Sequence, residues 1–269
     1  MKIGVVTAGN ENLTLFKFLN KFDHQYHIYY DQLNWPYGDN DFDESKKKIE
    51  SWIKYLINKW VDKIILSPVY ELDFIQAKKY KDKILPIFSG YLDQIVLPSS
   101  LVWKIWLFWN FADMQVAQKL MEKYSENFKL TENQKKIKKF NFPFKFWCKE
   151  VQMWQYFARK LSFSSLMTNR IIKFDLRYFK DANVDTLIPF DYWYFNYQKT
   201  IVKFFNQKKQ KFHKIEKLGE VFDKLDLEQD QKYSVNMYVN WHKEFVEREK
   251  RVLWNLQKWK NVELVFEKI

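Results

Sequence analysis

Short apolar runs alternate with longer amphipathic segments along the first third of the chain. The apolar runs have the length and the near-continuous hydrophobicity of buried strands, and the segments between them carry apolar residues at helical spacing. We therefore predict strands at 2–6, 26–30, 62–69 and 83–91. Helices are predicted at 13–22, 43–61 and 74–82, with Asp43 or Ser45 as the cap of the second helix.

The same rhythm returns in the rest of the chain. Strands are predicted at 102–109, 184–188 and 262–269, helices at 112–128, 151–163, 171–183 and 196–207, and a long charged helix within 233–261. This alternation indicates an α/β fold of two similar lobes, with mainly parallel sheets covered by helices. We place the first lobe at 1–97, completed by 206–269, and the second lobe at 98–205.

The composition is that of a globular protein with a basic surface. Hydrophobic residues make up 47% of the 269 residues, charged residues 29% and aromatic residues 20%, which excludes a disordered chain. The formal net charge of +12 is spread along the chain rather than gathered in one tail. A solvated surface explains this charge, and a face that binds a polyanion is the alternative. The excess of Lys over Arg favours the first, because bidentate phosphate contacts prefer Arg.

Five segments of the chain resemble glutamate racemase and the wider aspartate/glutamate racemase superfamily. They read "IGVVTAGNENLTLFKFL", "YYDQLNWPYG", "VDKIILSPVY", "KIWLFWNFAD" and "VDTLIPFDYWYF". Their order and spacing match the family's "IGVFDSGVGGLTVLKEL", "YfGDtarvPYG", "vdaiViACNTA", "rIGVIATpaT" and "VDTLiLGCTHYP". The resemblance runs from residue 3 to residue 195 and implies two α/β lobes with a cleft between them.

The resemblance also shows where this chain departs from racemase chemistry. Racemising glutamate requires a base on one face of Cα and an acid on the other, and the family uses two cysteines for this. The first cysteine position is Pro68 here and the second is Asp191, while the Asp-Ser pair of the first loop is Thr7-Ala8 and the histidine of the later loop is Trp193. Proline has no side-chain proton to exchange. The resemblance therefore implies a degenerate member that lacks both catalytic cysteines, and we do not expect glutamate racemase activity.

Some positions that contact substrate in the family remain polar or unchanged. The candidate ligand-binding residues are Gly9, Asp31, Pro36, Tyr37 and Gly38, with Asn110 and Asp113 at the place of the family's threonine pair. In contrast, the Asn-Thr pair after the first cysteine becomes Val69-Tyr70. Bulky aromatics at 70, 192 and 193 would fill a cleft sized for a small amino acid.

Three functions are open at this stage. The favoured hypothesis is a catalytically inactive glutamate racemase-like protein, a pseudoenzyme retained for a binding or structural role through an unidentified protein partner. The second is a one-base enzyme acting on a small carboxylate, with Asp191 as the base, because burial among aromatics would raise its pKa. The third is binding of nucleic acid or another polyanion, since segment 205–214 interleaves phenylalanine with lysine. A homodimer is also open, because dimers are common in the resembled family.

No cofactor or metal is expected. The histidines at 24, 27, 213 and 242 are scattered, and there is no glycine-rich phosphate motif.

The single cysteine, Cys148, excludes an internal disulfide and is expected to pack as a small hydrophobe, although Lys145 and Lys149 would lower its pKa if it were exposed. No apolar run reaches the length of a membrane span and the N-terminus lacks a signal pattern, so we expect a cytoplasmic protein.

Overall fold

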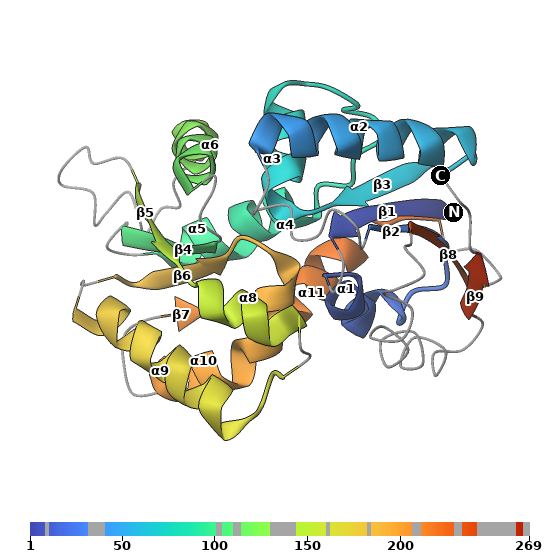
Figure 1. Ribbon diagram of the computed structural model, residues 1–269. Coiled ribbons are helices and arrows are strands. Elements are labelled where there is room, and N and C mark those ends of the chain that lie inside the picture. Colours follow the sequence, from blue (N-terminus) through green and yellow to red (C-terminus); the bar gives the residue numbers. More distant parts are fainter. Residues whose placement is uncertain are drawn as a thin grey trace. The chain divides into compact units, whose positions relative to one another are not determined.

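Two compact α/β units make up the chain in the computed structural model (Figure 1). The structure describes residues 1–8, 11–31, 41–100, 104–109, 114–129, 144–159, 162–181, 184–205, 211–228, 233–240 and 262–265. The first unit comprises Met1–Pro86 and Phe222–Ile269, and the second comprises Ile87–Val221. Each unit is built on a fully parallel sheet, which confirms the predicted α/β fold.

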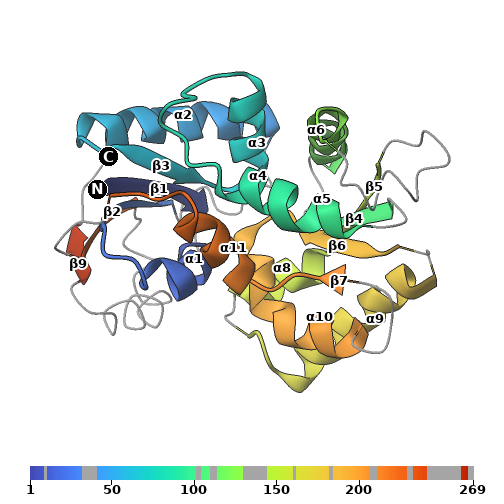
Figure 2. The same ribbon diagram turned by 180° about the vertical axis from the view of Figure 1, so that it is seen from behind.

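The first unit contains a five-stranded sheet in the order β3-β1-β2-β8-β9. Its strands are β1 (Lys2–Ala8), β2 (Gln25–Asp31), β3 (Lys63–Leu66), β8 (Ser234–Asn240) and β9 (Val262–Val265). Its helices are α1 (Glu11–Leu19), α2 (Phe42–Asn58) and α3 (Pro68–Gln76). Helix α1 covers one face of the sheet, and α2 covers the other (Figures 1 and 2). With helices on both faces, most side chains of β1, β2 and β3 are buried, which is why these strands read as apolar runs.

The second unit contains a four-stranded sheet in the order β5-β4-β6-β7. Its strands are β4 (Lys104–Trp109), β5 (Lys145–Glu150), β6 (Thr186–Pro189) and β7 (Lys211–Phe212). Its helices are α4 (Ile87–Tyr91), the π-helical turn η2 (Leu92–Val96), α5 (Leu97–Ser99), α6 (Met114–Glu126), α8 (Gln152–Arg159), α9 (Leu166–Asp181), the 3₁₀ turn η4 (Tyr192–Tyr197) and α10 (Gln198–Phe205). Helix α11 (Glu216–Asp223) continues past the end of this unit into the first.

Both sheets place their first strand between two later strands. In the first unit β2 lies on one side of β1 and β3 on the other. In the second unit β5 lies on one side of β4 and β6 on the other. Such a reversal of strand order is a topological switch point, and ligands of open α/β sheets bind at the carboxyl ends of the strands there. The two places to inspect are therefore the carboxyl ends of β1 and β3, and those of β4 and β6.

Several predicted elements differ in the structure. The strand predicted at 83–91 is wrong: Ile84 makes a single bridge to Ile64, and helix α4 begins at Ile87. The helix predicted at 74–82 instead begins at Pro68, whose missing N–H is tolerated in a first turn. It ends before Lys78, which has a left-handed backbone with φ 55°.

The strands β5 and β8 had not been predicted, and the final strand β9 confirms the prediction at the end of the chain. Most of the charged helix predicted within 233–261 lies outside the described residues. The cap of α2 is Asp41 rather than Asp43 or Ser45, because the Asp41 carboxylate accepts from the backbone N–H groups of Asp43 and Glu44.

Candidate functional site

A buried polar cluster lies at the switch point of the first sheet. Thr7 is near the end of β1, Glu11 and Asn12 open helix α1, and Ser67 follows β3. Thr7 Oγ1 donates a hydrogen bond of 2.7 Å to Asn12 Oδ1, and Ser67 Oγ donates to Glu11 Oε2. All four side chains are buried. The Glu11–Ser67 contact joins the segments that follow β1 and β3, so the polar groups at this switch point bind one another.

Asp31 ends strand β2 beside this cluster and is fully buried. Its Oδ2 accepts a hydrogen bond of 3.2 Å from Trp52 Nε1 on α2. The Trp52 ring stacks on Tyr29 with centroids 4.1 Å apart, which fixes the position of the indole N–H. Asp31, a candidate ligand-binding residue, is therefore held by a side chain of its own unit.

Pro68 takes the place of the family's first cysteine only by the sequence resemblance. It is the first residue of α3, directly after the carboxyl end of β3, and it is buried. Two residues later the buried Tyr70 ring stacks on Phe42 at 5.4 Å and 5°. Tyr70 thus places an aromatic ring in the first turn of α3, packed against Phe42 at the start of α2.

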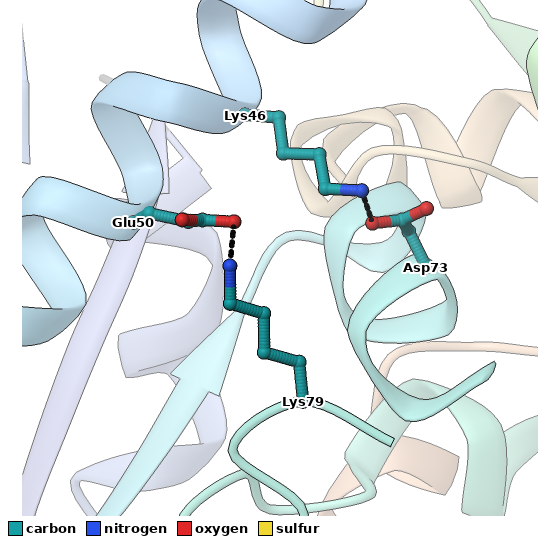
Figure 3. Close-up of polar contacts among 4 residues, drawn as sticks. All are labelled: Lys46, Glu50, Asp73 and Lys79. Carbon is teal, nitrogen blue, oxygen red and sulfur yellow. Dashed lines mark hydrogen bonds and ion pairs between the residues drawn. The ribbon is translucent and has the colours of Figure 1, made fainter. Parts of the chain in front are cut away.

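Two ion pairs tie the segment after β3 to helix α2 (Figure 3). Lys46 Nζ lies 2.6 Å from Asp73 Oδ2, and Lys79 Nζ lies 2.5 Å from Glu50 Oε1. The Lys46 ammonium also lies 5.6 Å from the centroid of the Phe74 ring. Lys46 thereby joins helix α3 to α2, and Glu50 joins α2 to the segment that follows α3.

Asp191 lies at the switch point of the second sheet. It follows β6 by two residues, is partly exposed, and stands at the N-cap position of η4. Its carboxylate makes no capping hydrogen bond, while its carbonyl oxygen accepts from the backbone N–H of Tyr194 at 3.3 Å. The buried strand β6 therefore delivers Asp191 to the carboxyl edge of the sheet.

The aromatic side chains around Asp191 are core residues. Phe190, Tyr192, Trp193, Tyr194 and Phe195 are all buried. Phe190 and Tyr192 both meet the Phe88 ring edge-on, at 5.5 and 6.4 Å. Trp193 contacts Tyr194 at 3.6 Å, in the place of the family's histidine. The aromatic side chains that follow β6 are thus buried within the second unit and form part of its core.

A serine–histidine pair is a further polar contact of the second unit. Ser99 Oγ and His213 Nε2 are 2.8 Å apart. Ser99 Oγ also donates to the carbonyl oxygen of Val96 at 2.8 Å, so its single proton is used and His213 Nε2–H donates to it. Burial, with help from Lys211 and Lys217, lowers the His213 pKa to about 4. A neutral histidine that donates to serine is not a base poised to activate it.

The remaining candidates show no metal site or reactive thiol. His24 and His27 are buried in the first unit, where His27 Nδ1 lies 3.0 Å from the Tyr238 hydroxyl. Among the described side chains, no three histidine, cysteine, aspartate or glutamate groups gather as metal ligands. Cys148 Sγ donates to the carbonyl oxygen of Met114 at 3.4 Å, and burial raises its pKa to about 12. Cys148 thus packs as a small hydrophobe, as predicted.

Several candidates fall outside the residues that the structure describes. These are Gly9, Pro36, Tyr37, Gly38, Asn110, Asp113 and His242, together with the side chain of Ala8. Among the helices that are described, none combines the length and the apolar content needed to cross a membrane.

Sequence reasoning missed Glu11, Asn12 and Ser67. Glu11 and Asn12 could have been found from the sequence, because they are two polar residues at the start of a helix that follows a buried strand.

Comparison with known proteins shows a likeness of fold. No family model matches the chain, and no curated protein matches it. Glutamate racemase from Francisella tularensis, solved with D-glutamate, superposes with a TM-score of 0.68 at 17% identity over 100% of this chain and 97% of that one. Glutamate racemase from Thermus thermophilus gives 0.71 at 14% identity over 98% and 96%. That from Aquifex pyrophilus gives 0.65 at 18% over 98% of both chains. The chain therefore has the fold of the glutamate racemases.

Proposed function

We propose that this protein is a glutamate racemase-like pseudoenzyme, which does not racemise amino acids and acts by binding a protein partner. The observation that carries the proposal is the pair of residues delivered to the two switch points. Pro68 follows β3 and Asp191 follows β6, and neither can act as a thiol. The one thiol of the chain, on Cys148, is bonded to the Met114 carbonyl and has a raised pKa.

The first switch point supports the same proposal. In the family's opening segment two glycines stand at the places of Glu11 and Asn12. Here both side chains are buried and bonded within the unit, Glu11 to Ser67 and Asn12 to Thr7. A glycine leaves its backbone open to a ligand, whereas these side chains occupy the space in front of it. The polar side chains at this switch point are thus bonded to one another, which supports a structural role in place of binding an amino acid.

A one-base enzyme is the second candidate, and one observation favours it. The Asp191 carboxylate lies at the carboxyl edge of β6, is partly exposed, and does not cap the helix that it precedes. A single carboxylate can remove a proton from one face of a carbon acid without a second acid opposite. This candidate predicts proton exchange with one enantiomer of a substrate.

Hydrogen exchange at Cα tests both candidates together. The full-length protein is incubated in D₂O with D- or L-glutamate, and with D- or L-aspartate, and loss of the Cα proton signal is followed by NMR. The Francisella enzyme serves as the positive control. We expect no exchange with any of the four.

Two results would contradict the pseudoenzyme. Exchange with both enantiomers, together with their interconversion, would show a racemase. Exchange with one enantiomer that disappears in Asp191→Asn would establish the one-base enzyme.

A further inference from the structure

Helix α9 exposes large hydrophobic side chains on the surface of the second unit. Met167 is 62% exposed, Phe174 71% and Tyr178 58%. By the helical period these three positions follow one another along one side of the helix. The opposite side of α9 is buried against the unit through Thr168, Ile172, Leu176 and Phe179. We call the line of Met167, Phe174 and Tyr178 the apolar stripe.

A line of cations runs beside the apolar stripe. Arg170, Lys173 and Arg177 are all exposed, and the same helical period places them on the neighbouring strip of the α9 surface. We call the line of Arg170, Lys173 and Arg177 the basic stripe. Two of the five arginines of the chain belong to it. Arginine pairs with carboxylates through two parallel hydrogen bonds, which lysine cannot make.

The acidic residue within this stretch of α9 does not neutralise the basic stripe. Asp175 is half-buried and its Oδ2 accepts a hydrogen bond of 2.7 Å from Trp154 Nε1. Lys149 adds a further cation next to the apolar stripe, because its Nζ lies 4.9 Å from the centroid of the Tyr178 ring. The exposed face of α9 is therefore hydrophobic along one line and positive beside it.

Tyr178, at one end of the apolar stripe, is held in place before any partner arrives. The Tyr178 ring meets the Trp106 ring edge-on at 5.4 Å, and Trp106 itself stacks on Trp147 at 5.9 Å. A side chain that is ordered beforehand loses little conformational entropy on binding. Aromatic residues, methionine and arginine are also the residue types enriched at protein interfaces.

We propose that the exposed face of α9 is a docking site for an acidic amphipathic helix of a partner protein. Stripes one side chain wide, with Met167 and Phe174 seven residues apart and Arg170 and Arg177 likewise, match the repeat of a helix lying alongside. The acidic residues of such a helix would pair with the basic stripe, and its apolar residues would cover the apolar stripe.

Charge and layout disfavour the other occupants. A second copy of this chain would bring three more cations to the same interface. An anionic membrane favours an apolar centre with cations on both flanks, whereas Arg170, Lys173 and Arg177, the cations of α9 whose side chains the structure describes, lie on one side only.

A selection with displayed peptides tests the proposal on the full chain. The probe is a display library of helix-forming peptides about 20 residues long, a length that spans α9. It is panned against the wild type with excess soluble Arg170→Glu/Arg177→Glu protein as competitor. We expect enriched sequences with acidic residues beside apolar residues at three-, four- and seven-residue spacing. Their binding should weaken at least about tenfold in the double variant and in Phe174→Ala, as for hot-spot residues.

Trp60→Ala is the matched control, because Trp60 is 81% exposed but lies in the first unit. It should leave peptide binding unchanged, and all variants should keep the far-UV circular dichroism of the wild type. Enrichment of basic or non-helical sequences, or of none, would overturn the proposal. So would α9-dependent binding to phosphatidylserine vesicles without peptide binding, or a dimer in sedimentation that Phe174→Ala dissociates.

The docking site rests on the binding role proposed above, but the two fail separately. Peptide selection reports only on α9, whereas hydrogen exchange at Cα reports only on the switch points. If the protein racemises glutamate but still selects acidic helices, the pseudoenzyme proposal is wrong and the proposal of a docking site on α9 stands.

Discussion

Ser67 donates a hydrogen bond to the buried carboxylate of Glu11, and this contact ties the carboxyl end of β3 to the first turn of α1. The two residues are 56 positions apart in sequence. They meet because β1 and β3 are neighbours in the sheet and the segments that follow them leave from the same edge. The contact occupies the place where an α/β sheet of this order receives a ligand.

Glu11 is expected to stabilise the first unit. Replacing it by alanine removes the acceptor for Ser67 and leaves buried polar groups without their partner, which costs about 1–3 kcal/mol of unfolding free energy. Glu11→Gln is the matched control, because its amide oxygen still accepts from Ser67 and the loss should be smaller. Urea unfolding followed by circular dichroism measures both. Equal stability of wild type and Glu11→Ala would show that the contact contributes nothing to the fold.

The sequence predicted the class of fold because buried parallel strands carry a strong local signal. β1, β2, β4 and β6 are apolar runs, and each was found within a few residues of its observed bounds. β5, "KFWCKE", was not predicted because only three consecutive apolar residues stand between charged ones, and its side chains are mostly half-exposed. The helix α3 was displaced because its start depends on Pro68 at the first helical position, next to an apolar strand that conceals the boundary.

The site was predictable only where it follows strands directly. Pro68 and Asp191 stand at the ends of β3 and β6 and were found through the resemblance, which is a pattern along the chain. The bond between Glu11 and Ser67 depends on the pairing of β1 with β3, which no local pattern specifies. The sequence does not reveal the role of Glu11 for this reason, although Glu11 lies in the first of the five segments that resemble the family.

Gly90 is required by the packing of the second unit. A Cβ added there would lie 2.7 Å from Val221 Cγ1, and the branched valine has few other rotamers. Gly90→Ala should therefore destabilise the protein by about 1–3 kcal/mol, although alanine is the better helix former.

A double-mutant cycle with Val221→Ala identifies the clash as the cause. The Gly90→Ala change should cost much less when Val221 is already alanine. Chemical denaturation of the four proteins gives the coupling free energy. Additive effects would mean that the clash with Val221 is not the reason for the glycine.

Cys148 is expected to be inert in the folded protein. Burial, and next the nearby Glu122 carboxylate, raise the thiol pKa to about 12, so the reactive thiolate is scarce at neutral pH. Reaction with a thiol reagent such as dithionitrobenzoate at pH 8 should be at least about a hundredfold slower than for the same protein unfolded in urea. A rapid stoichiometric reaction of the native protein would mean that the thiol is accessible and ionised.

His213 is expected to make the second unit lose stability on mild acidification. Burial, with Lys211 and Lys217 nearby, lowers its pKa to about 4, whereas the unfolded chain has an ordinary histidine pKa of about 6.5. Between these two values the unfolded state binds the extra proton, so the free energy of unfolding falls as the pH falls from about 6.5 to 4 and levels off below. The full effect of this one group is roughly 2–3 kcal/mol.

Comparison with His213→Gln isolates this contribution. Glutamine can still bond Ser99 Oγ but does not titrate, so its unfolding free energy should fall less than that of the wild type over the same range. Asp93 and Asp175, whose pKa values are raised by burial, act in the opposite direction, and His27 acts in the same direction, but all three are present in both proteins. Urea titrations at pH 7, 6, 5 and 4.5 measure the difference. If the unfolding free energies of the two proteins fall in parallel with pH, the pKa of His213 is the same in the folded and unfolded states, and the prediction is wrong.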